Sequence, residues 1–421
     1  MAANLFTPIL NDRTRSIHFF NGRLLTGEDL TAEQRGQRAT HELLAQSIGD
    51  GIVRGLEVSI EVGIDAATRL AAPVVNVTGG VAINRKGETL YLPSDTRVQL
   101  VRTADATPPA RTLFTACTPP QSGVYVAGAG VYLLTLCSTV AADGSASVSG
   151  LGGQPSGCNS RFAVDAVQFR LIELPMTDAE MSDIPRLRNL VAYRCFGETG
   201  LPSYALDPFT TTNEPATLLD SLRPGSLTDC DVPLATFYWT ATGGLVWADM
   251  WSVRRRTAQR SDSAVHPSPT DRRRSIAEAM VLQFETQIAQ MRSERTLTQS
   301  IGVRTYFDHL PPIGMLPLFT SSAAGININQ FFAGRTTHGP TFVDTDKLAS
   351  IFERALDFPP IDTTSPEVIW LYLVVENTRA ANAIGSTRPQ GYVMFVNGHS
   401  DYAANARFNL SLWNYANYAL V

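Results

Sequence analysis

The feature that most limits the fold of this chain is a change in hydrophobic period after residue 50. From Gly51 onward, apolar residues occupy alternate positions, which is the period of a β-strand with one buried face. The dipeptides Gly79-Gly80 and Lys86-Gly87 separate these stretches and are typical of tight turns. The pattern predicts an antiparallel meander. Its apolar positions are Ile52, Val53, Leu56, Val58, Ile60, Val62, Val75, Val77, Val81, Ile83, Leu90 and Leu92.

Further stretches rich in β-branched and aromatic residues follow along the chain, and each predicts a strand. A stretch rich in glycine and serine, residues 141–160, is predicted to form a long mobile loop between two of them. The expected strands cover residues 130–139, 163–174, 190–196, 232–253, 303–307, 368–376 and 390–397.

A helix is predicted near the N-terminus. Thr26 suits its N-cap, and Glu28 and Asp29 place negative charge at the positive end of the helix dipole. The helix is expected over residues 28–47, with the glycines of 49–51 as its stop. Its apolar content is thin, so we expect it to pack on the body of the protein or on a partner.

Two more helices are predicted farther along. Residues 270–292 carry an apolar stripe at helical spacing, which packs either on its own domain or as a coiled coil with another subunit. A short helix is expected over residues 344–355, capped by Asp344 or Thr345. The stripe of the longer helix consists of Ile276, Met280, Phe284, Ile288 and Met291.

The chain has 421 residues, more than one hydrophobic core usually serves. We therefore predict a mostly β, α+β multi-domain fold with antiparallel meander or sandwich domains. The expected divisions are a strand–helix docking segment (1–50), a central β-rich domain (51–235), an aromatic, arginine-rich connector with the long helix (236–296) and a C-terminal β domain (297–421).

Charge restricts the classes of partner. Charged residues make up only 17% of the chain and the net charge is -5, which argues against binding to duplex nucleic acid. One run of arginines is predicted to lie in an exposed loop or strap, either as a solvated face or as a surface for an acidic partner, protein rather than nucleic acid. The run consists of Arg254, Arg255, Arg256, Arg260, Arg272, Arg273 and Arg274.

No arrangement of reactive residues indicates an enzyme, a cofactor or a metal site. The six histidines lack the spacing of metal ligands, and no glycine-rich phosphate-binding motif precedes a helix. Asp229, Asp231 and Asp249 leave an alternative open, because paired carboxylates can cleave glycosidic bonds. The simpler interpretation is that Asp229 and Asp231 shape a turn before Pro233.

The cysteines and the N-terminal residues indicate in which cellular compartment the protein is expected to assemble. Five dispersed cysteines without a CxxC pair predict reduced core thiols, and a bridge between Cys137 and Cys158 stays open as an alternative. Residues 1–12 lack the features of a signal peptide, and no stretch approaches the roughly 18 to 20 apolar residues of a spanning helix. We expect assembly in the cytoplasm and no transmembrane segment.

Several motifs resemble one known family. Residues 19–34, FFNGRLLTGEDLTAEQ, are similar to an N-terminal motif of proteins encoded with phage tails and extracellular contractile injection systems. The resemblance continues at HELL (41–44), GIVRGLEV (51–58) and GVAIN followed by GE (80–88), although Gly79 stands where that family has proline. Shorter similar pieces are FRL (169–171), DVPLA (231–235), ARFNL (406–410) and WNY (413–415).

The resemblance implies a structural part of a contractile, phage-tail-like particle, in its baseplate, fibre-like periphery or cap. It implies no reaction, and it implies partners among baseplate, sheath, tube or spike proteins and several symmetric copies, such as a trimer or hexamer. Such a particle is released from the cell or docked on a membrane. The residues expected to make assembly contacts are Phe19, Phe20, Arg23, Leu24, Leu25, Asp29, Arg254, Arg255, Arg256, Trp413 and Tyr415.

Two alternatives remain. One is a receptor- or carbohydrate-binding fibre module, in which exposed aromatic side chains such as Trp413 and Tyr415 stack on sugars of a cell-surface glycan. The other is a hydrolase of cell-envelope glycans that uses the aspartates named above.

Overall fold

The computed structural model describes residues 17–60, 74–100, 130–148, 157–197, 217–223, 225–240, 243–258, 271–319, 324–376 and 391–398. Its helices are α1 (Gly27–Ile48), α2 (Asp178–Ser182), α3 (Ile184–Phe196), α5 (Leu218–Ser221), α6 (Asp271–Ser293), η1 (Val303–Thr305), α7 (Ile328–Phe331) and α8 (Thr345–Ala355).

The strands of the first half are β1 (Gly51–Arg54), β2 (Val58–Ile60), β3 (Val74–Val77), β4 (Gly80–Ile83), β5 (Thr89–Leu92), β6 (Thr96–Gln99), β7 (Gly130–Val148), β8 (Gly157–Glu173), β9 (Asp231–Thr240) and β10 (Gly244–Asp249). Those of the second half are β11 (His309–Leu310), β12 (Ile313–Pro317), β13 (Thr337–Val343), β14 (Ile361–Asp362), β15 (Ile369–Val374) and β16 (Tyr392–Asn397).

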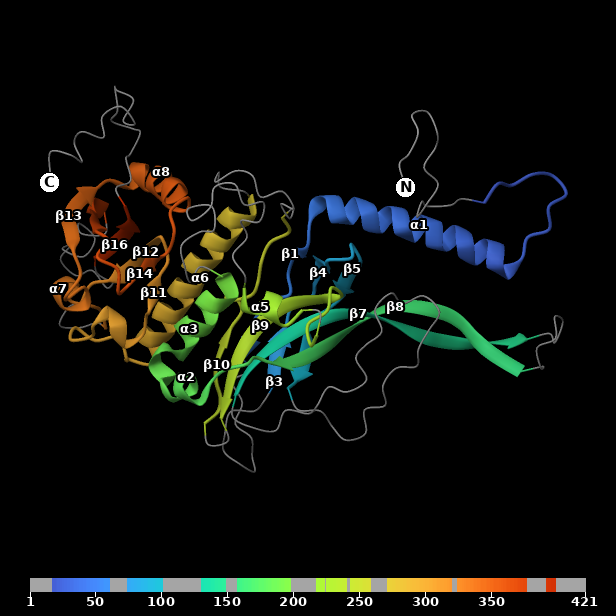
Figure 1. Ribbon diagram of the computed structural model, residues 1–421, viewed down its shortest axis with the longest axis horizontal. Helices are drawn as coiled ribbons and strands as arrows, with labels where there is room; N and C mark the ends of the chain where they lie inside the picture. Colours follow the sequence, from blue (N-terminus) through green and yellow to red (C-terminus); the bar gives the residue numbers. More distant parts are fainter. Residues whose placement is uncertain are drawn as a thin grey trace, which may run out of the picture.

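The architecture is a mostly β, α+β multi-domain fold, as predicted. Strands β1 to β10 form three sheets and strands β11 to β16 form two others, with no sheet shared between these groups in the described chain. Helices α3 and α6 lie between the two groups (Figure 1). The domain boundaries given above stay predictions.

The predicted antiparallel strands are confirmed, but they form two three-stranded sheets in the orders β1-β4-β5 and β2-β3-β6 instead of a meander, because β1 pairs with β4 and β3 pairs with β6. Their inward residues, such as Leu56 and Leu90, share one core with the central sheet. Glycine is required at position 55, directly after β1, where the backbone passes close to that of Gly79 before β4. Gly55 has φ +61°, and a Cβ there would lie 2.0 Å from the carbonyl oxygen of Gly79.

A four-stranded antiparallel sheet follows, in the order β10-β9-β7-β8. The prediction of a long loop over residues 141–160 is wrong, because β7 and β8 extend through most of it and pair without a break in register from Tyr132–Glu173 to Val148–Gly157. Glycine and serine give little local preference for a strand, but the partner strand supplies the backbone hydrogen bonds whatever the side chains are.

The predicted strand over residues 190–196 is also wrong, because this stretch is the second half of helix α3. Pro185 lies in the first turn of the helix, and Gly197 ends it in the left-handed conformation with φ +84°. Leu187 and Val191 pack on the central sheet, whereas Tyr193 and Phe196 pack against α6. Burial on two sides produces the near-continuous apolar run that resembles a buried strand in the sequence.

Helix α6 confirms the predicted amphipathic helix, and its stripe is buried within its own chain. Met280, Phe284, Ile288 and Met291 are all buried, and Phe284 packs against Phe307 and Phe395 of the C-terminal sheet region. The short helix α8 also forms as predicted.

The C-terminal sheet has the order β12-β16-β15-β13, with β13 parallel to β15 and the other pairs antiparallel. Strands β15 and β16 confirm two predictions. The predicted strand over residues 303–307 is wrong, because this stretch forms the single 3-10 turn η1. Val303 and Phe307 stand four residues apart, so one turn buries both of them.

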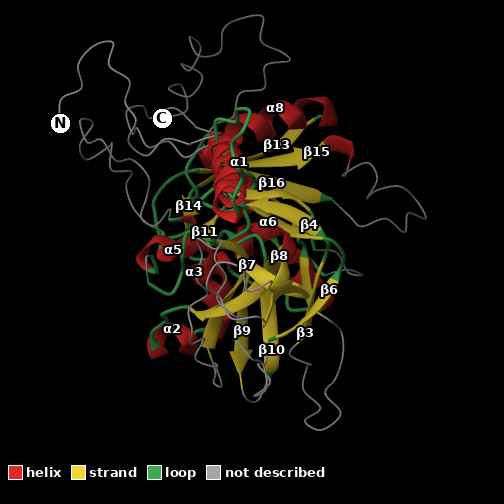
Figure 2. Cartoon of the chain, turned by 90° about the vertical axis from the view of Figure 1, so that its right-hand side faces the viewer, coloured by secondary structure: helices red, strands yellow, loops and turns green. Residues whose placement is uncertain are grey.

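Helix α1 begins and ends where the sequence predicts. Thr26 and Asp29 form a reciprocal capping box at its start, and Gly49 caps its end with φ +103°. The helix runs along the outside of the molecule on the same side as the extended part of β7 and β8 (Figures 1 and 2). None of its residues is buried.

Candidate functional site

The predicted assembly residues of the N-terminal segment form an exposed apolar turn ahead of α1. Phe19, Phe20 and Leu25 are about half exposed, and Leu24 is 89% exposed. Large apolar side chains normally gain free energy by leaving water, so an ordered segment that presents four of them is typical of an interaction surface.

Arg23 and Asp29 hold this turn in shape rather than extend the apolar surface. Arg23 donates to the carboxylate of Asp29 at 2.7 Å and to the carbonyl of His18 at 2.9 Å, and its guanidinium lies 6.0 Å from the ring centre of Phe20. The backbone and hydroxyl of Thr26 donate to the same carboxylate and lower the pKa of Asp29.

Further exposed apolar residues lie on α1, one in its first turn and three in its last two turns. Leu30, Leu43, Leu44 and Ile48 are each more than half exposed. A surface helix of a folded domain usually buries its apolar stripe, whereas α1 leaves these side chains in water. We call Phe19, Phe20, Leu24, Leu25, Leu30, Leu43, Leu44 and Ile48 the α1 surface.

Polar contacts, rather than apolar packing, attach α1 to the body. Gln46 donates to the backbone carbonyl of Lys86 at 2.8 Å, and Arg38 lies 2.5 Å from the carboxylate of Asp165 on β8. Gly87 makes room for the helix, because a Cβ there would lie 2.1 Å from the carbonyl oxygen of Glu42. These contacts place the helix against the body while its apolar side chains stay accessible.

Two residues of the arginine run, Arg254 and Arg255, do not lie on the exposed surface that the sequence predicts. Arg254 donates to the carbonyls of Leu56 (2.7 Å) and Gly55 (2.5 Å), and burial lowers its pKa. Arg255 donates to three backbone carbonyls of the turn after β10 and lies 4.7 Å from the ring centre of Phe196. The prediction of an exposed run is wrong for Arg254 and Arg255, because unpaired carbonyls of irregular backbone need donors and these guanidinium groups supply them.

Three other residues predicted to make assembly contacts are Arg256, Trp413 and Tyr415. Arg256 is exposed and lies 3.6 Å from Glu278 of α6, so it alone of the three consecutive arginines presents its charge outward. Trp413 and Tyr415 lie outside the described residues.

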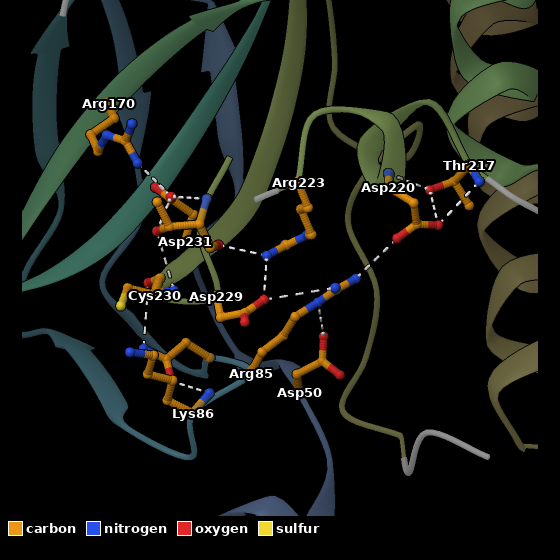
Figure 3. Close-up of polar contacts among 12 residues, drawn as sticks. Asp50, Arg85, Lys86, Arg170, Thr217, Asp220, Arg223, Asp229, Cys230 and Asp231 are labelled. Atoms are coloured by element: carbon orange, nitrogen blue, oxygen red, sulfur yellow. Dashed lines mark hydrogen bonds and ion pairs between the residues drawn. The ribbon is translucent and has the colours of Figure 1, made fainter. Parts of the chain in front are cut away.

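A polar network beneath the C-terminal end of α1 joins the β4–β5 turn, α5 and the turn before β9 (Figure 3). Arg85 is surrounded by the carboxylates of Asp50 (3.8 Å), Asp220 (3.4 Å) and Asp229 (3.8 Å), and Arg223 lies 2.9 Å from Asp229. Burial alone would raise the pKa of Asp220, but hydrogen bonds from Thr217 and the charge of Arg85 outweigh it and lower the pKa.

Two of the three aspartates considered for catalysis, Asp231 and Asp249, are enclosed by structural partners, whereas Asp229 is 56% exposed. Asp231 is 2% exposed, pairs with Arg170 and accepts hydrogen bonds from Thr135 (2.8 Å) and from the backbone of Thr228 (2.8 Å). Its hydrogen bonds to Thr228 are those of a turn, which agrees with the simpler interpretation of this sequence.

Asp249 is buried in a similar way at the end of β10, on the same face of the central sheet. It is 1% exposed and accepts hydrogen bonds from Arg188 (2.7 Å), Gln283 (2.9 Å) and the backbone of Ser252 (3.1 Å). These contacts join α3, α6 and the end of β10, so the carboxylate has a structural role and is closed to a polymeric glycan.

The cysteines depart in part from the prediction. Cys137 and Cys195 are buried free thiols, and burial raises the pKa of each to about 12. Cys230 is disulfide-bonded, and its partner is neither of these two. The prediction that all five are reduced is therefore wrong, and so is the alternative bridge between Cys137 and Cys158. Sequence spacing cannot reveal a pairing that folding creates.

Two searches of the described residues give negative results. No group of three or more His, Cys, Asp or Glu side chains there is able to hold a metal ion. No helix in the same residues has the length and apolar character needed to cross a membrane.

One surface feature was missed by the sequence analysis. The outer half of β8 leaves Phe162 and Val164 exposed, on the strand that faces α1 through Asp165. The apolar residues at 162 and 164 were the available signal: Val164 lies in the strand predicted over residues 163–174, but its exposure together with Phe162 was not predicted.

Comparisons with known proteins do not identify a family. A scan against protein-family models gives no match, and a search of curated proteins finds no similar sequence.

Proposed function

We propose that this chain is a structural subunit of a contractile, phage-tail-like injection particle and acts through protein–protein assembly. Its position would be in the baseplate, the fibre-like periphery or the cap, in several symmetric copies. Neighbouring baseplate, sheath, tube or spike proteins would be its partners.

The observation that carries the assembly part of this proposal is the α1 surface. A helix of 22 residues with none of them buried gains little free energy from its own domain. Docking on a neighbouring subunit would cover the exposed leucines and stabilise the helix, at about 25 cal/mol per Å² of apolar area removed from water.

The particle part of the proposal is supported by the sequence resemblance of residues 19–34, which coincides with this surface. Phe19, Phe20, Leu24 and Leu25 belong to the resembling motif and are exposed. Arg23 and Asp29 of the same motif hold the turn that presents them. A motif whose apolar residues serve no described core of the chain suits a role in binding another molecule.

The test is affinity purification of the tagged protein from its native host, followed by mass spectrometry of the bound proteins and negative-stain imaging. We expect sheath, tube or spike proteins and tail-like particles in the eluate. Recovery of the protein without them, or with surface glycans instead, would refute the proposal.

Matched variants sharpen this experiment. Leu24→Glu combined with Leu44→Glu places charge on the α1 surface, and we expect at least about a tenfold loss of bound particle proteins, because a buried unpaired carboxylate opposes docking. Gln34→Glu adds one such negative charge at an exposed polar position of α1 and should leave the yield unchanged. Melting temperatures close to wild type would show that every variant is folded, since all three positions are exposed.

A further inference from the structure

The outer part of the β7–β8 hairpin is a two-stranded ribbon. Strand β9 pairs with β7 only as far as Cys137, whereas β7 and β8 continue to pair out to Val148 and Gly157. In Figure 1 the ribbon extends beyond the sheets, beneath α1. Within the described chain, β8 has β7 as its only neighbour in the sheet, so its other edge is open.

An open ribbon of this kind is unfavourable in isolation. Two strands alone are marginally stable in water, and an edge strand presents a row of N–H and C=O groups that are ready to pair with another strand. Proteins usually protect such an edge with charge, proline or a bulge. Here residues 161–165 contain no proline, and Phe162 (53% exposed) and Val164 (42% exposed) point to the same face of the strand.

The sequence of this edge is complementary to itself. It reads Arg161-Phe162-Ala163-Val164-Asp165. In an antiparallel pair centred on Ala163, Arg161 lies opposite Asp165 of the second copy and Phe162 lies opposite Val164 of the second copy. Opposite residues of an antiparallel pair project to the same face, so one face carries two ion pairs and the other carries four apolar side chains.

We infer that β8 pairs antiparallel with β8 of a second copy of this chain about a twofold axis at Ala163. The pairing is isologous and closes after two copies. It converts two ribbons into a four-stranded sheet, which has enough strands to be stable in water. The inference rests on the proposed assembly function and deepens it, because it names the partner of one edge.

The register follows from the charges. An axis moved to Phe162 places Arg161 opposite Ala163 of the second copy, and an axis moved to Val164 places Asp165 opposite Ala163. Only the axis at Ala163 pairs the two opposite charges within residues 161–165 and leaves small side chains at the crowded centre.

The existing contact of Asp165 is compatible with this arrangement. Arg38 approaches one carboxylate oxygen, Oδ1, and the side chain is still 73% exposed. A carboxylate has about four lone-pair sites, so Asp165 can accept from Arg38 and from Arg161 of the second copy together. The guanidinium of Arg161 lies over the ring of Phe162, 5.1 Å from its centre, so the ion pair with the second copy requires this side chain to turn towards the face of Asp165.

The first test is oxidative cross-linking of purified Ala163→Cys protein. Directly opposite residues have Cα atoms about 4.5–5.5 Å apart, within the roughly 4.4–6.8 Å that a disulfide spans. Ala142→Cys is the matched control, because Ala142 is the exposed β7 partner of Ala163. Its two copies would lie about 14 Å apart across three strand spacings, too far for a bond. We expect covalent dimers for Ala163→Cys, and only the wild-type background for Ala142→Cys.

The second test exchanges the charges. Arg161→Asp puts two carboxylates opposite each other at both ends of the pair, and we expect about a tenfold or larger rise in the dimer dissociation constant, measured by analytical ultracentrifugation. Asp165→Arg does the same with positive charge. An equimolar mixture of the two variants restores both ion pairs between unlike chains, so heterodimers should form with near wild-type affinity.

The outcomes separate this inference from the proposed function. Purified protein that is monomeric at every concentration, or that forms dimers without cross-linking at Ala163→Cys and without response to the charge exchange, overturns the inference. A chain that passes these tests but recovers no particle proteins from its host refutes the particle proposal alone. A chain recovered with particles whose Ala163→Cys variant cross-links to a different protein refutes the self-pairing alone.

Discussion

The buried ion pair between Arg188 and Asp249 yields the sharpest prediction about stability. Arg188 is 5% exposed, and it donates to Asp249 and also to Gln290 of α6. Asp249→Ala removes the carboxylate and leaves the guanidinium charge buried without its counter-ion. Breaking one partner of a buried pair costs about 3–5 kcal/mol. At about 2–4 °C per kcal/mol for domains of this size, the melting temperature should fall by about 6–20 °C.

The assay is thermal unfolding followed by circular dichroism, with two comparison variants. Asp229→Ala removes a carboxylate that is 56% exposed and should change the free energy of unfolding by less than about 1 kcal/mol. Replacing both partners, with Arg188→Met and Asp249→Leu, should destabilise less than Asp249→Ala alone, because no unpaired charge remains. An Asp249→Ala protein that melts within about 2 °C of wild type would refute the reasoning.

Three further predictions test the core, the α1 attachment and the thiols. Phe284→Ala should lower the free energy of unfolding by about 3–5 kcal/mol, as measured by denaturant titration, whereas Thr286→Ala on the exposed side of α6 should change little. Gly87→Ala should release the last turns of α1, visible as faster amide hydrogen exchange there, because its Cβ would meet the carbonyl of Glu42 at 2.1 Å and its φ is +82°. Cys137 and Cys195 have a pKa raised to about 12, so at pH 8 both remain protonated thiols. They should resist iodoacetamide in the folded protein and react after unfolding, as followed by mass spectrometry; rapid labelling of the native state would contradict their burial.

Short sequence patterns were enough to predict a helix or strand when its cause lies within one helical turn or on one face of a strand. The capping pair Thr26 and Asp29, the stop at Gly49 and the stripe of α6 each lie within a few residues, so their physical causes are contained in the sequence. The alternation after residue 50 predicted the strands for the same reason, because a strand with one buried face has period two, whereas their order in two sheets depended on tertiary contacts.

Long-range contacts decided the features that the sequence analysis missed. Residues 141–148 form a strand because β8 pairs with them, and α3 resembles a strand in sequence because two separate cores bury its opposite sides. The strand partners of residues 141–148 lie 9 to 23 residues farther along the chain, and the two cores around α3 include residues from distant segments, so the composition of each stretch alone favoured the wrong structure.

The features of the candidate site also fall into those that the sequence predicts and those that depend on tertiary contacts. The sequence by itself determined the apolar turn before α1 and the charge and size pattern of residues 161–165. Tertiary structure alone decided that the turn is exposed, that the edge of β8 has no second neighbour in the described chain, and that Arg254 and Arg255 serve backbone carbonyls instead of a partner. The physical reason is that burial and hydrogen-bond partners are set by which distant segments meet, whereas periodicity and capping depend only on neighbours along the chain.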